Sequence, residues 1–429
     1  MGSDEEGVVG PRSIPLGHRG LLRMQREIPI VLTLSLLVLF IECLPVSGKI
    51  APNGHIRVFC FGDVIEQYGG FNSYTVIEID PAIEMTLVPT RPGYLGGPDV
   101  AKRNLRIYMP RTYSSLVEGY DLILSSDADS TVFQDEWMEW MARSVSEGGL
   151  GVEWLGSIGR SQTQQNLDWS QTPVAEVLPS YTSPEHYKYG IFRVRIRDPE
   201  EELMKALPWE DSPPLANLDM QIPKEGSRVF AVVQHPREWP LITYWEVGAG
   251  TGLTFASKFP NGVMPWSDDW PLFQQAMTYL AYRTSGKSLP SDHLLFQALL
   301  SSFFEYETGD SILMSVIYFV EEFGGNPQML YEELDRVDEI KDNSDREYLE
   351  ENYAESMRLV SEAIAQQREI MIMSLKAKDR ALLWIYAIEW FAFTGTLLVS
   401  GFVLWSLMVK RRLYAGVGSS RVGSGLRER

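Results

Sequence analysis

The stretch YDLILSSDADSTVFQDEWMEWMARSVSEGGLGVEWLGS, residues 120–157, decides the fold class. It opens with a near-continuous apolar run that is typical of a strand buried in a parallel sheet. Apolar residues then recur at helical spacing over 133–145, and a Gly-Gly pair at 148–149 ends that helix. A short apolar run over 151–157 predicts a second strand. Strand, helix and strand at this spacing form a right-handed parallel crossover, so the sequence predicts an α/β fold.

Further strands extend this pattern on both sides. They are expected at 55–63, 228–233, 241–247 and 252–259. Three glycines over 248–252 make the last two strands a hairpin, because a dinucleotide-binding loop would need a helix after it. A helix is expected at 270–283.

Charge is distributed unevenly along the chain. There are 38 basic and 57 acidic residues, a net charge of −19, with 45% apolar composition. Phosphate contacts require clustered Lys and Arg, so no nucleic-acid partner is expected. Residues 1–49 are neutral overall and residues 410–429 carry +5, so the region between them holds −24. Cys43 and Cys60 are the two cysteines, which excludes an internal disulfide in that region and a cysteine-based zinc site.

The first apolar segment runs over residues 28–41 and follows three arginines. It is too short to cross a hydrocarbon core of about 30 Å comfortably, but it suits the core of a signal peptide. Residues 1–48 are therefore expected to form a signal peptide, with an uncleaved N-terminal anchor as the alternative. Met24 is a second candidate for the true start, because a signal of ordinary length would follow it.

A second apolar segment is long enough to span a membrane. Residues 390–409 carry no charge, and the apolar pattern extends back past Glu389. The basic triplet at 410–412 marks the cytoplasmic side by the positive-inside rule. The expected elements are a transmembrane helix at 382–409 and a basic cytoplasmic tail at 410–429. The chain is thus predicted to be a single-pass protein of the cell membrane, with its N-terminal domain outside the cytoplasm.

Five motifs carry a resemblance to a known family. They are GGLGVEWLGSIGRSQTQQ (148–165), TPVAEVLPS (172–180), DPEEELMKALPW (198–209), YWEVGAGTGLTFASKF (244–259) and WPLFQQAMTYLAY (270–282). In these motifs the region 50–287 resembles glutamine amidotransferase-like domains, which are similar in fold to class I glutamine amidotransferases and ThuA-like proteins. The resemblance implies a flavodoxin-like open, mostly parallel sheet, and a fold of this kind supplies no reaction by itself.

The resemblance to class I enzymes implies a Cys nucleophile on a tight strand-to-helix turn, with a His base. The corresponding turn, LGSIGRSQ (155–162), contains Ser157 and no Cys, while Cys60 falls within the first strand. His235 is followed by a strand rather than a helix, so it is interpreted as a turn residue. The domain is therefore predicted to lack glutaminase activity.

Polar residues after the buried strands are the candidate ligand-binding residues. Asp127 and Asp129 come at the carboxyl end of a predicted parallel strand, where open α/β sheets bind ligands. With Ser157 and Arg160 they are candidates to bind a polar small molecule, and the Asp pair also has the oxygen ligands of a divalent cation. The competing interpretations are a helix cap at Asp129 or Ser130, and a plain glycine-rich turn at Ser157, which lacks the upstream glycine of a nucleophile elbow. No metal site and no cofactor are predicted.

Residues 288–380 change to helical patterns. Apolar residues keep helical spacing on both sides of Gly309, which is expected to separate two helices. This region predicts a small helical subdomain and stalk, or alternatively a helix pair that lies against the bilayer or a membrane partner.

A seam of apolar residues then repeats at alternating steps of four and three toward the membrane segment. Gln367 and Ser374 weaken it, so packing against a helix around 334–340 is expected over a long coiled coil. As a single helix, residues 348–380 would reach about 50 Å.

We therefore predict an exported, catalytically inactive amidotransferase-like domain that serves as a binding or scaffold subunit of a membrane complex. Its partner is expected to be a membrane protein, bound through the stalk or the transmembrane helix. The alternative is an extracytoplasmic hydrolase of an amide or a sugar that uses Ser157 and Asp127.

Overall fold

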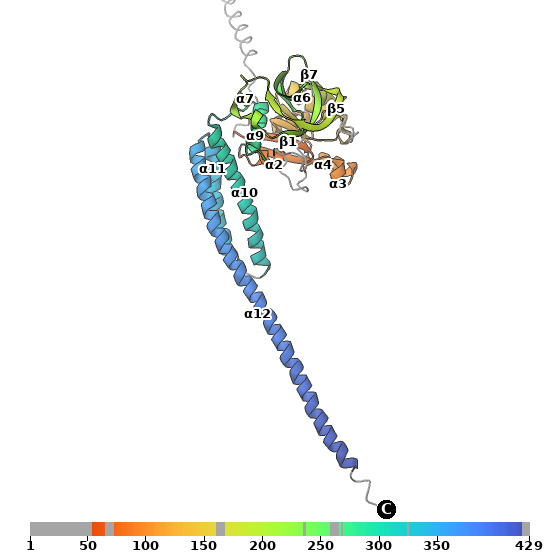
Figure 1. The fold of residues 1–429 in the computed structure, drawn as a ribbon, viewed down its shortest axis with the longest axis vertical. Coiled ribbons are helices and arrows are strands. Elements are labelled where there is room, and N and C mark those ends of the chain that lie inside the picture. The colour runs from red at the N-terminus through yellow and green to blue at the C-terminus, as the bar shows by residue number, and fades with distance from the viewer. Residues whose placement is uncertain are drawn as a thin grey trace, which may run out of the picture. The chain divides into compact units, whose positions relative to one another are not determined.

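The computed structural model describes residues 54–64, 73–159, 168–234, 237–257, 266, 269–323 and 326–422. The predicted signal peptide, Arg160, His235 and the end of the tail lie outside these residues. Within them, a mixed α/β domain is followed by a region of long helices, as shown in Figure 1.

The α/β domain is built on a sheet of eight strands. From one edge to the other they are β2 (Ile83–Pro89), β1 (Ile56–Gly62), β3 (Leu122–Ser126), β4 (Gly151–Leu155), β10 (Gly250–Phe255), β9 (Glu238–Val247), β8 (Arg228–Gln234) and β6 (Val194–Ile196). The first five are paired in parallel, and β9, β8 and β6 are added in antiparallel pairs. The predicted α/β class with a mostly parallel sheet is confirmed. The edge strand β2 was not predicted.

Burial on both faces explains why the central strands are so apolar. In β1, Val58 and Cys60 belong to the core on one face of the sheet, and Phe59 and Phe61 belong to the core on the other. A strand covered on both faces has no position for a solvated side chain, and it therefore reads as a continuous apolar run. The hairpin between β9 and β10 is also as predicted, with Gly250 paired to Val247.

Helices cover both faces of the sheet. One face packs against α4 (Pro98–Tyr108), α5 (Tyr113–Gly119) and α6 (Asp135–Ser146), and the other against α2 (Ser73–Glu78) and α9 (Phe273–Ser285). Two short helices, α3 (Pro92–Leu95) and α7 (Glu202–Ala206), and the two-stranded antiparallel sheet of β5 (Ser180–Phe192) and β7 (Leu215–Pro223) complete the domain. Gly286, in the stretch SGKS, is the left-handed cap of α9 rather than part of a phosphate-binding loop.

The helical region is a bundle of α10 (His293–Glu322), α11 (Gln328–Leu349) and the upper part of α12 (Tyr353–Val422). The predicted separation at Gly309 is wrong, because α10 runs through that residue. Residues 348–380 are not one helix, since Tyr348 lies in α11 and the chain turns at Glu351, where φ is 63°, before α12 begins at Tyr353. The apolar faces of α10 and α11 pack against α12, so the C-terminal region is helical, as predicted.

One of the two polar residues that weaken the α12 seam, Gln367, has a partner in the bundle. Gln367 Nε2 donates to the Tyr306 carbonyl oxygen at 3.1 Å. Gly309 makes room for this amide, because a Cβ there would lie 2.3 Å from Gln367 Oε1. A glycine that resembles a helix end in the sequence is therefore a packing requirement inside a continuous helix.

The bundle and the α/β domain share one hydrophobic core. A continuous cluster of buried residues includes Leu122 of the sheet, Tyr282 of α9, Phe296 of α10 and Ile364 of α12. The ring of Phe296 lies 6.1 Å from that of Tyr282 and 5.9 Å from that of Tyr353. The helices are thus anchored on the same sheet face that α9 covers.

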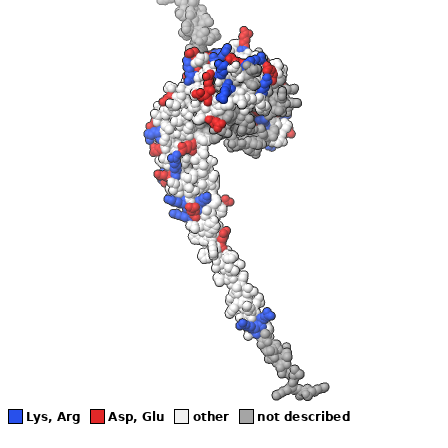
Figure 2. Space-filling model, viewed as in Figure 1, with Lys and Arg blue, Asp and Glu red and all other residues white. Residues whose placement is uncertain are grey.

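The lower part of α12 has no cover in the structure. Ala381 is 5% exposed, and from Leu383, at 66%, most of the large apolar side chains down to Leu413 are exposed. In Figure 2 this part of α12 is free of charged side chains between Glu389 and a basic cluster at 410–412. Among the described residues, α12 is the one helix long and apolar enough to cross a membrane.

A carboxyl group lies in the middle of the central strand β4. Glu153 is fully buried, and among the described residues neither of its carboxyl oxygens has a hydrogen-bond partner. The register surrounds it with Leu124 on one side and Leu253 on the other. Desolvation therefore raises the pKa of Glu153 to about 8.

We expect Glu153→Gln to change how folding stability depends on pH. The folded-state pKa of Glu153 is raised from 4.5 to about 8, so its stabilising contribution is complete below pH 4.5 and is lost as the pH rises through 8. In that interval the wild-type protein should lose about 1.4 kcal/mol more unfolding free energy per pH unit than the variant. Urea unfolding of the detergent-solubilised protein measures this slope.

The comparison is most direct above pH 6. Asp80, whose pKa is raised to about 6 by burial, contributes a slope of the same sign at lower pH in both proteins. Equal slopes for the two proteins between pH 6 and 8 would contradict the assignment to Glu153.

Candidate functional site

The carboxyl ends of the parallel strands lie in one row. The aligned residues are Pro89 of β2, Gly62 of β1, Ser126 of β3, Leu155 of β4 and Phe255 of β10. The residues that follow these positions meet at one edge of the sheet, which is where open α/β sheets bind ligands. The candidates Asp127 and Ser157 both lie at this edge, after neighbouring strands.

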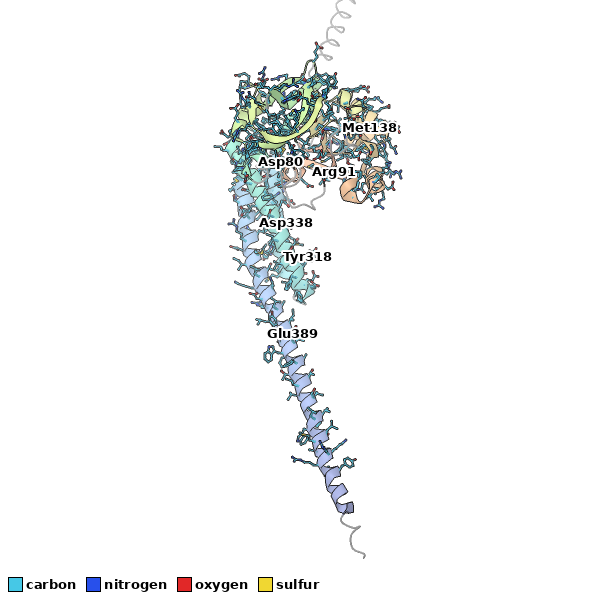
Figure 3. All side chains as sticks on the ribbon, turned by 45° about the vertical axis from the view of Figure 1, so that its right-hand side comes forward. Asp80, Arg91, Met138, Tyr318, Asp338 and Glu389 are labelled. Carbon is cyan, nitrogen blue, oxygen red and sulfur yellow. The ribbon has the colours of Figure 1, made fainter. Side chains whose placement is uncertain are left out.

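An arginine bridges two of the strand ends. Arg91 Nη1 lies 2.6 Å from Asp63 Oδ2 and 3.2 Å from Asp127 Oδ2. All three side chains are nearly buried, and Figure 3 labels Arg91 within the α/β domain. The guanidinium compensates two carboxylates that would otherwise repel each other in a partly desolvated site.

The backbone around this cluster leaves little freedom. Gly62 has a φ of 128°, and a Cβ there would lie 1.8 Å from the Ser126 carbonyl oxygen. Asp63 N donates to that same oxygen at 2.7 Å. Asp127 adopts a left-handed φ of 54°, which is uncommon for a residue with a side chain. Such conformations persist where the surroundings over-determine them, and functional sites are enriched in them.

Asp129 serves the local turn. It is the N-cap of a 3₁₀ turn over Ser130–Val132, and its Oδ1 accepts hydrogen bonds from Thr131 N at 2.9 Å and Thr131 Oγ1 at 2.7 Å. The longer helix α6 begins only after Gln134. Asp127 and Asp129 therefore have different surroundings. Asp129 acts as a cap, although it caps the 3₁₀ turn and not the longer helix.

Ser157 lies in a closed turn. Its hydroxyl is buried and donates to the Gly159 carbonyl oxygen at 2.9 Å, while its own carbonyl oxygen accepts from Trp154 Nε1 at 3.1 Å. The next amide, Ile158 N, donates to Asp219 Oδ2 at 3.2 Å. The hydroxyl would have to leave its carbonyl partner before it could attack a substrate.

Cys60 has none of the properties of a catalytic thiol. It is fully buried inside β1, and desolvation raises the pKa of its thiol well above the ordinary value. A nucleophilic cysteine needs a lowered pKa and access to substrate. Its position in the first strand is as predicted.

A cavity of about 330 Å³ opens beside the Ser157 turn. Its lining combines Ile158 with Asp168, Ser170 and the start of β5 at Ser180–Pro184. These residues come from three separate stretches of sequence, so no local sequence motif predicts the cavity.

The structure also adds Asp63 and Arg91 to the predicted candidates. Arg91 comes two residues after the end of β2, in the sequence VPTR (88–91). Recognition of β2 as a strand would have identified Arg91 as a residue at a strand end. Among the described residues no group of three His, Cys, Asp or Glu side chains is placed to hold a metal ion.

Comparisons with known proteins do not assign the chain to a family. No family model and no curated protein matches it. Solved structures with a similar arrangement include the cytoplasmic protein STM3548 from Salmonella typhimurium, at 17% identity and a TM-score of 0.43, covering 53% of this chain and 99% of that one. The cytoplasmic protein STM1381 from Salmonella typhimurium LT2 gives 18% identity and a TM-score of 0.43, with the same coverage of 53% and 99%.

A cold-adapted β-galactosidase from Rahnella sp. R3 is similar at 12% identity and a TM-score of 0.33, over 53% of this chain and 31% of that one. Likenesses this weak carry no argument about activity. Kinship with glutamine amidotransferase-like domains therefore stays a prediction.

Replacing Arg91 by Gln should destabilise the protein by about 3 kcal/mol, because Asp63 and Asp127 then share a nearly buried site without the guanidinium between them. Urea unfolding of the detergent-solubilised chain measures the change. Adding Asp127→Asn to the Arg91→Gln variant should recover part of the loss, since one of the two opposed charges is then gone.

The matched control is Arg143→Gln. Arg143 pairs with Glu147 on the exposed face of α6, so this substitution should leave stability unchanged within error. If Arg91→Gln were as harmless as the control, the Asp63–Arg91–Asp127 cluster would have no structural role.

Proposed function

We propose that the protein is a single-pass membrane protein whose α/β domain is a binding or scaffold subunit of a membrane complex. The observation that carries the proposal is the change of burial along α12. Its upper part lies in the core of the bundle, whereas most side chains between Ala381 and the basic residues at 410–412 are apolar and exposed. Exposed apolar surface costs about 25 cal/mol per Å² in water, so a run of this length requires lipid around it.

The orientation follows from the flanking residues. The uncharged stretch 390–409 corresponds to about 30 Å of helix. The basic residues Lys410, Arg411 and Arg412 favour the cytoplasmic side, which would place the bundle and the α/β domain outside the cytoplasm. Trp390 and Trp405 lie near the two ends of the stretch, where aromatic residues favour the membrane interface.

A binding role fits the α/β domain better than catalysis. The parallel block has the strand order of flavodoxin-like folds, whose carboxyl edge receives ligands. The Asp63–Arg91–Asp127 cluster lies at that edge, and the separate cavity lined by Ile158 opens beside the turn that follows β4. The candidate nucleophile Ser157 is occupied by a backbone carbonyl. The partner we propose is another membrane protein that contacts the bundle or the apolar part of α12.

Charging the middle of the apolar segment should release the protein from membranes. Each Lys near the bilayer centre costs about 2.5–3.5 kcal/mol, so Leu397→Lys with Leu398→Lys should greatly weaken insertion. Alkaline carbonate extraction should leave the wild type in the membrane pellet and move the variant to the supernatant.

The control places the same charges higher on α12. Ile372 and Leu375 are exposed within the bundle region, and Ile372→Lys with Leu375→Lys should stay in the pellet. Wild-type protein in the carbonate supernatant would contradict the anchor. Digestion of the α/β domain by protease added to intact cells tests the orientation, and complete protection would contradict it.

The alternative function, a hydrolase using Ser157 and Asp127, draws on one observation. The register pairs Ser126 with Leu155, so the two candidates follow neighbouring strands. A serine-reactive fluorophosphonate tests it on the purified protein. We expect no labelling, because the Ser157 hydroxyl is buried and hydrogen-bonded. Labelling that Ser157→Ala abolishes, and that replacement of the buried serine at the same edge, Ser257→Ala, preserves, would establish the hydrolase instead.

A further inference from the structure

The end of the bundle farthest along α10 exposes a group of apolar side chains. Tyr318, Phe323 and Met329 are 60%, 41% and 60% exposed, although Val320 and Leu330 beside them are buried in the bundle. The rings of Phe319 and Phe323 are 4.4 Å apart and form one aromatic surface. We call Tyr318, Phe319, Phe323 and Met329 the bundle tip.

Contacts place the bundle tip at a defined level on α12. Phe296 meets Tyr353 at the start of both helices, and Phe319 meets Lys378, whose Nζ lies 5.3 Å from the ring centre. The two helices therefore run in the same direction, and Figure 3 shows Tyr318 on α10 above Glu389 on α12.

The bundle ends at the level where the apolar segment begins. Ala381, at 5% exposed, is the last α12 side chain buried by the bundle, and Leu383, at 66%, opens the exposed apolar run. Lys378 precedes Ala381 by less than one helical turn, a rise of about 5 Å. The aromatic surface of the bundle tip is therefore continuous with the apolar surface of α12.

We propose that the bundle tip is a second membrane-contact site, which enters the interfacial layer of the leaflet on the α/β side. This rests on the proposed function, because it requires α12 to cross the bilayer. The occupant is lipid, since the tip continues a surface that lipid covers. Tyr and Phe beside aliphatic groups suit the headgroup boundary, where one end of a side chain is apolar and the other wet.

The charges around the tip agree with this depth. The Lys378 ammonium group lies beside the Phe319 ring, and a lysine at this level can extend that group toward the headgroups. Glu321 and Glu322 are exposed on the same turn of α10, and the Tyr331 hydroxyl donates to Glu321 Oε2 at 3.4 Å, so this turn also carries charge that requires hydration. Two attachment points, the tip and the apolar segment, would set the tilt of the bundle relative to the membrane.

Site-directed spin labelling of the full chain tests the proposal. Cys43→Ser removes one native thiol, and Cys60 stays unlabelled because it is fully buried and burial raises the pKa of its thiol. Nitroxides are placed singly at Tyr318→Cys and Phe323→Cys, and the protein is reconstituted in phosphatidylcholine vesicles. Collision rates with oxygen and with a water-soluble nickel chelate report depth.

Two further labels serve as references. Leu294→Cys marks water, because Leu294 is 79% exposed at the opposite end of α10. Leu398→Cys marks the centre of the apolar segment. We expect the ratio of oxygen to nickel collisions at Tyr318 and Phe323 to exceed that at Leu294 several-fold and to stay below that at Leu398.

The outcomes separate the two proposals. If the tip labels give the same ratio of oxygen to nickel collisions as Leu294 while Leu398 reports lipid, the second contact site is overturned and the proposed anchor is not. Tip labels shielded from both reagents would mean that protein covers the tip, a second copy of this chain in such vesicles, and would also overturn it. An aqueous ratio at Leu398 would overturn the proposed anchor and the second site with it.

Discussion

A buried chain of hydrogen bonds from Asp80 to Tyr348 is the interaction on which the rest of the architecture depends. Tyr282 donates to Asp80 Oδ2 at 2.7 Å, Ala82 N donates to Asp80 Oδ1 at 2.7 Å, and the hydroxyls of Tyr282 and Tyr348 are 3.2 Å apart. The three linked side chains come from the turn before β2, from α9 and from α11, so they join sheet, covering helix and bundle. Each is fully buried or nearly so, and a group left without its partner would cost about 1–3 kcal/mol. This penalty and the surrounding aromatic core favour a single arrangement of the bundle on the α/β domain.

The strand β2 connects this junction to the candidate site. Asp80 precedes β2 and Arg91 follows it. The junction therefore lies at the amino ends of the parallel strands, and the Asp63–Arg91–Asp127 cluster lies at their carboxyl ends. At about 3.3 Å per residue, the seven residues of β2 separate them by roughly 23 Å. The bundle is therefore attached away from the edge that would receive a ligand. The proposed binding role requires this arrangement, because it leaves the carboxyl ends of the strands clear of the bundle.

Much of the α/β fold was predictable because burial on both faces leaves a local signal. The strands β1, β3 and β4 are apolar runs, and the helix between β3 and β4 shows its periodicity. The strand β2 was missed because it is an edge strand, with charged or half-exposed positions that interrupt the apolar run. Gly309 was misread as a helix end, since its role depends on Gln367, which lies far along the chain. Asp127 was found as a strand-end carboxylate, but its partner Arg91 depended on the missed strand.

The sequence by itself determined the α/β class, the order of its central strands along the chain and the position of the apolar segment, because these follow from local periodicity and hydropathy. Tertiary structure alone decided which residues share a site and where the bundle ends. Arg91 meets Asp63 and Asp127 because parallel pairing aligns three strand ends. The boundary at Ala381 exists because α10 and α11 stop covering α12 at that level. Both depend on contacts between residues distant in the chain, and no local pattern encodes such contacts.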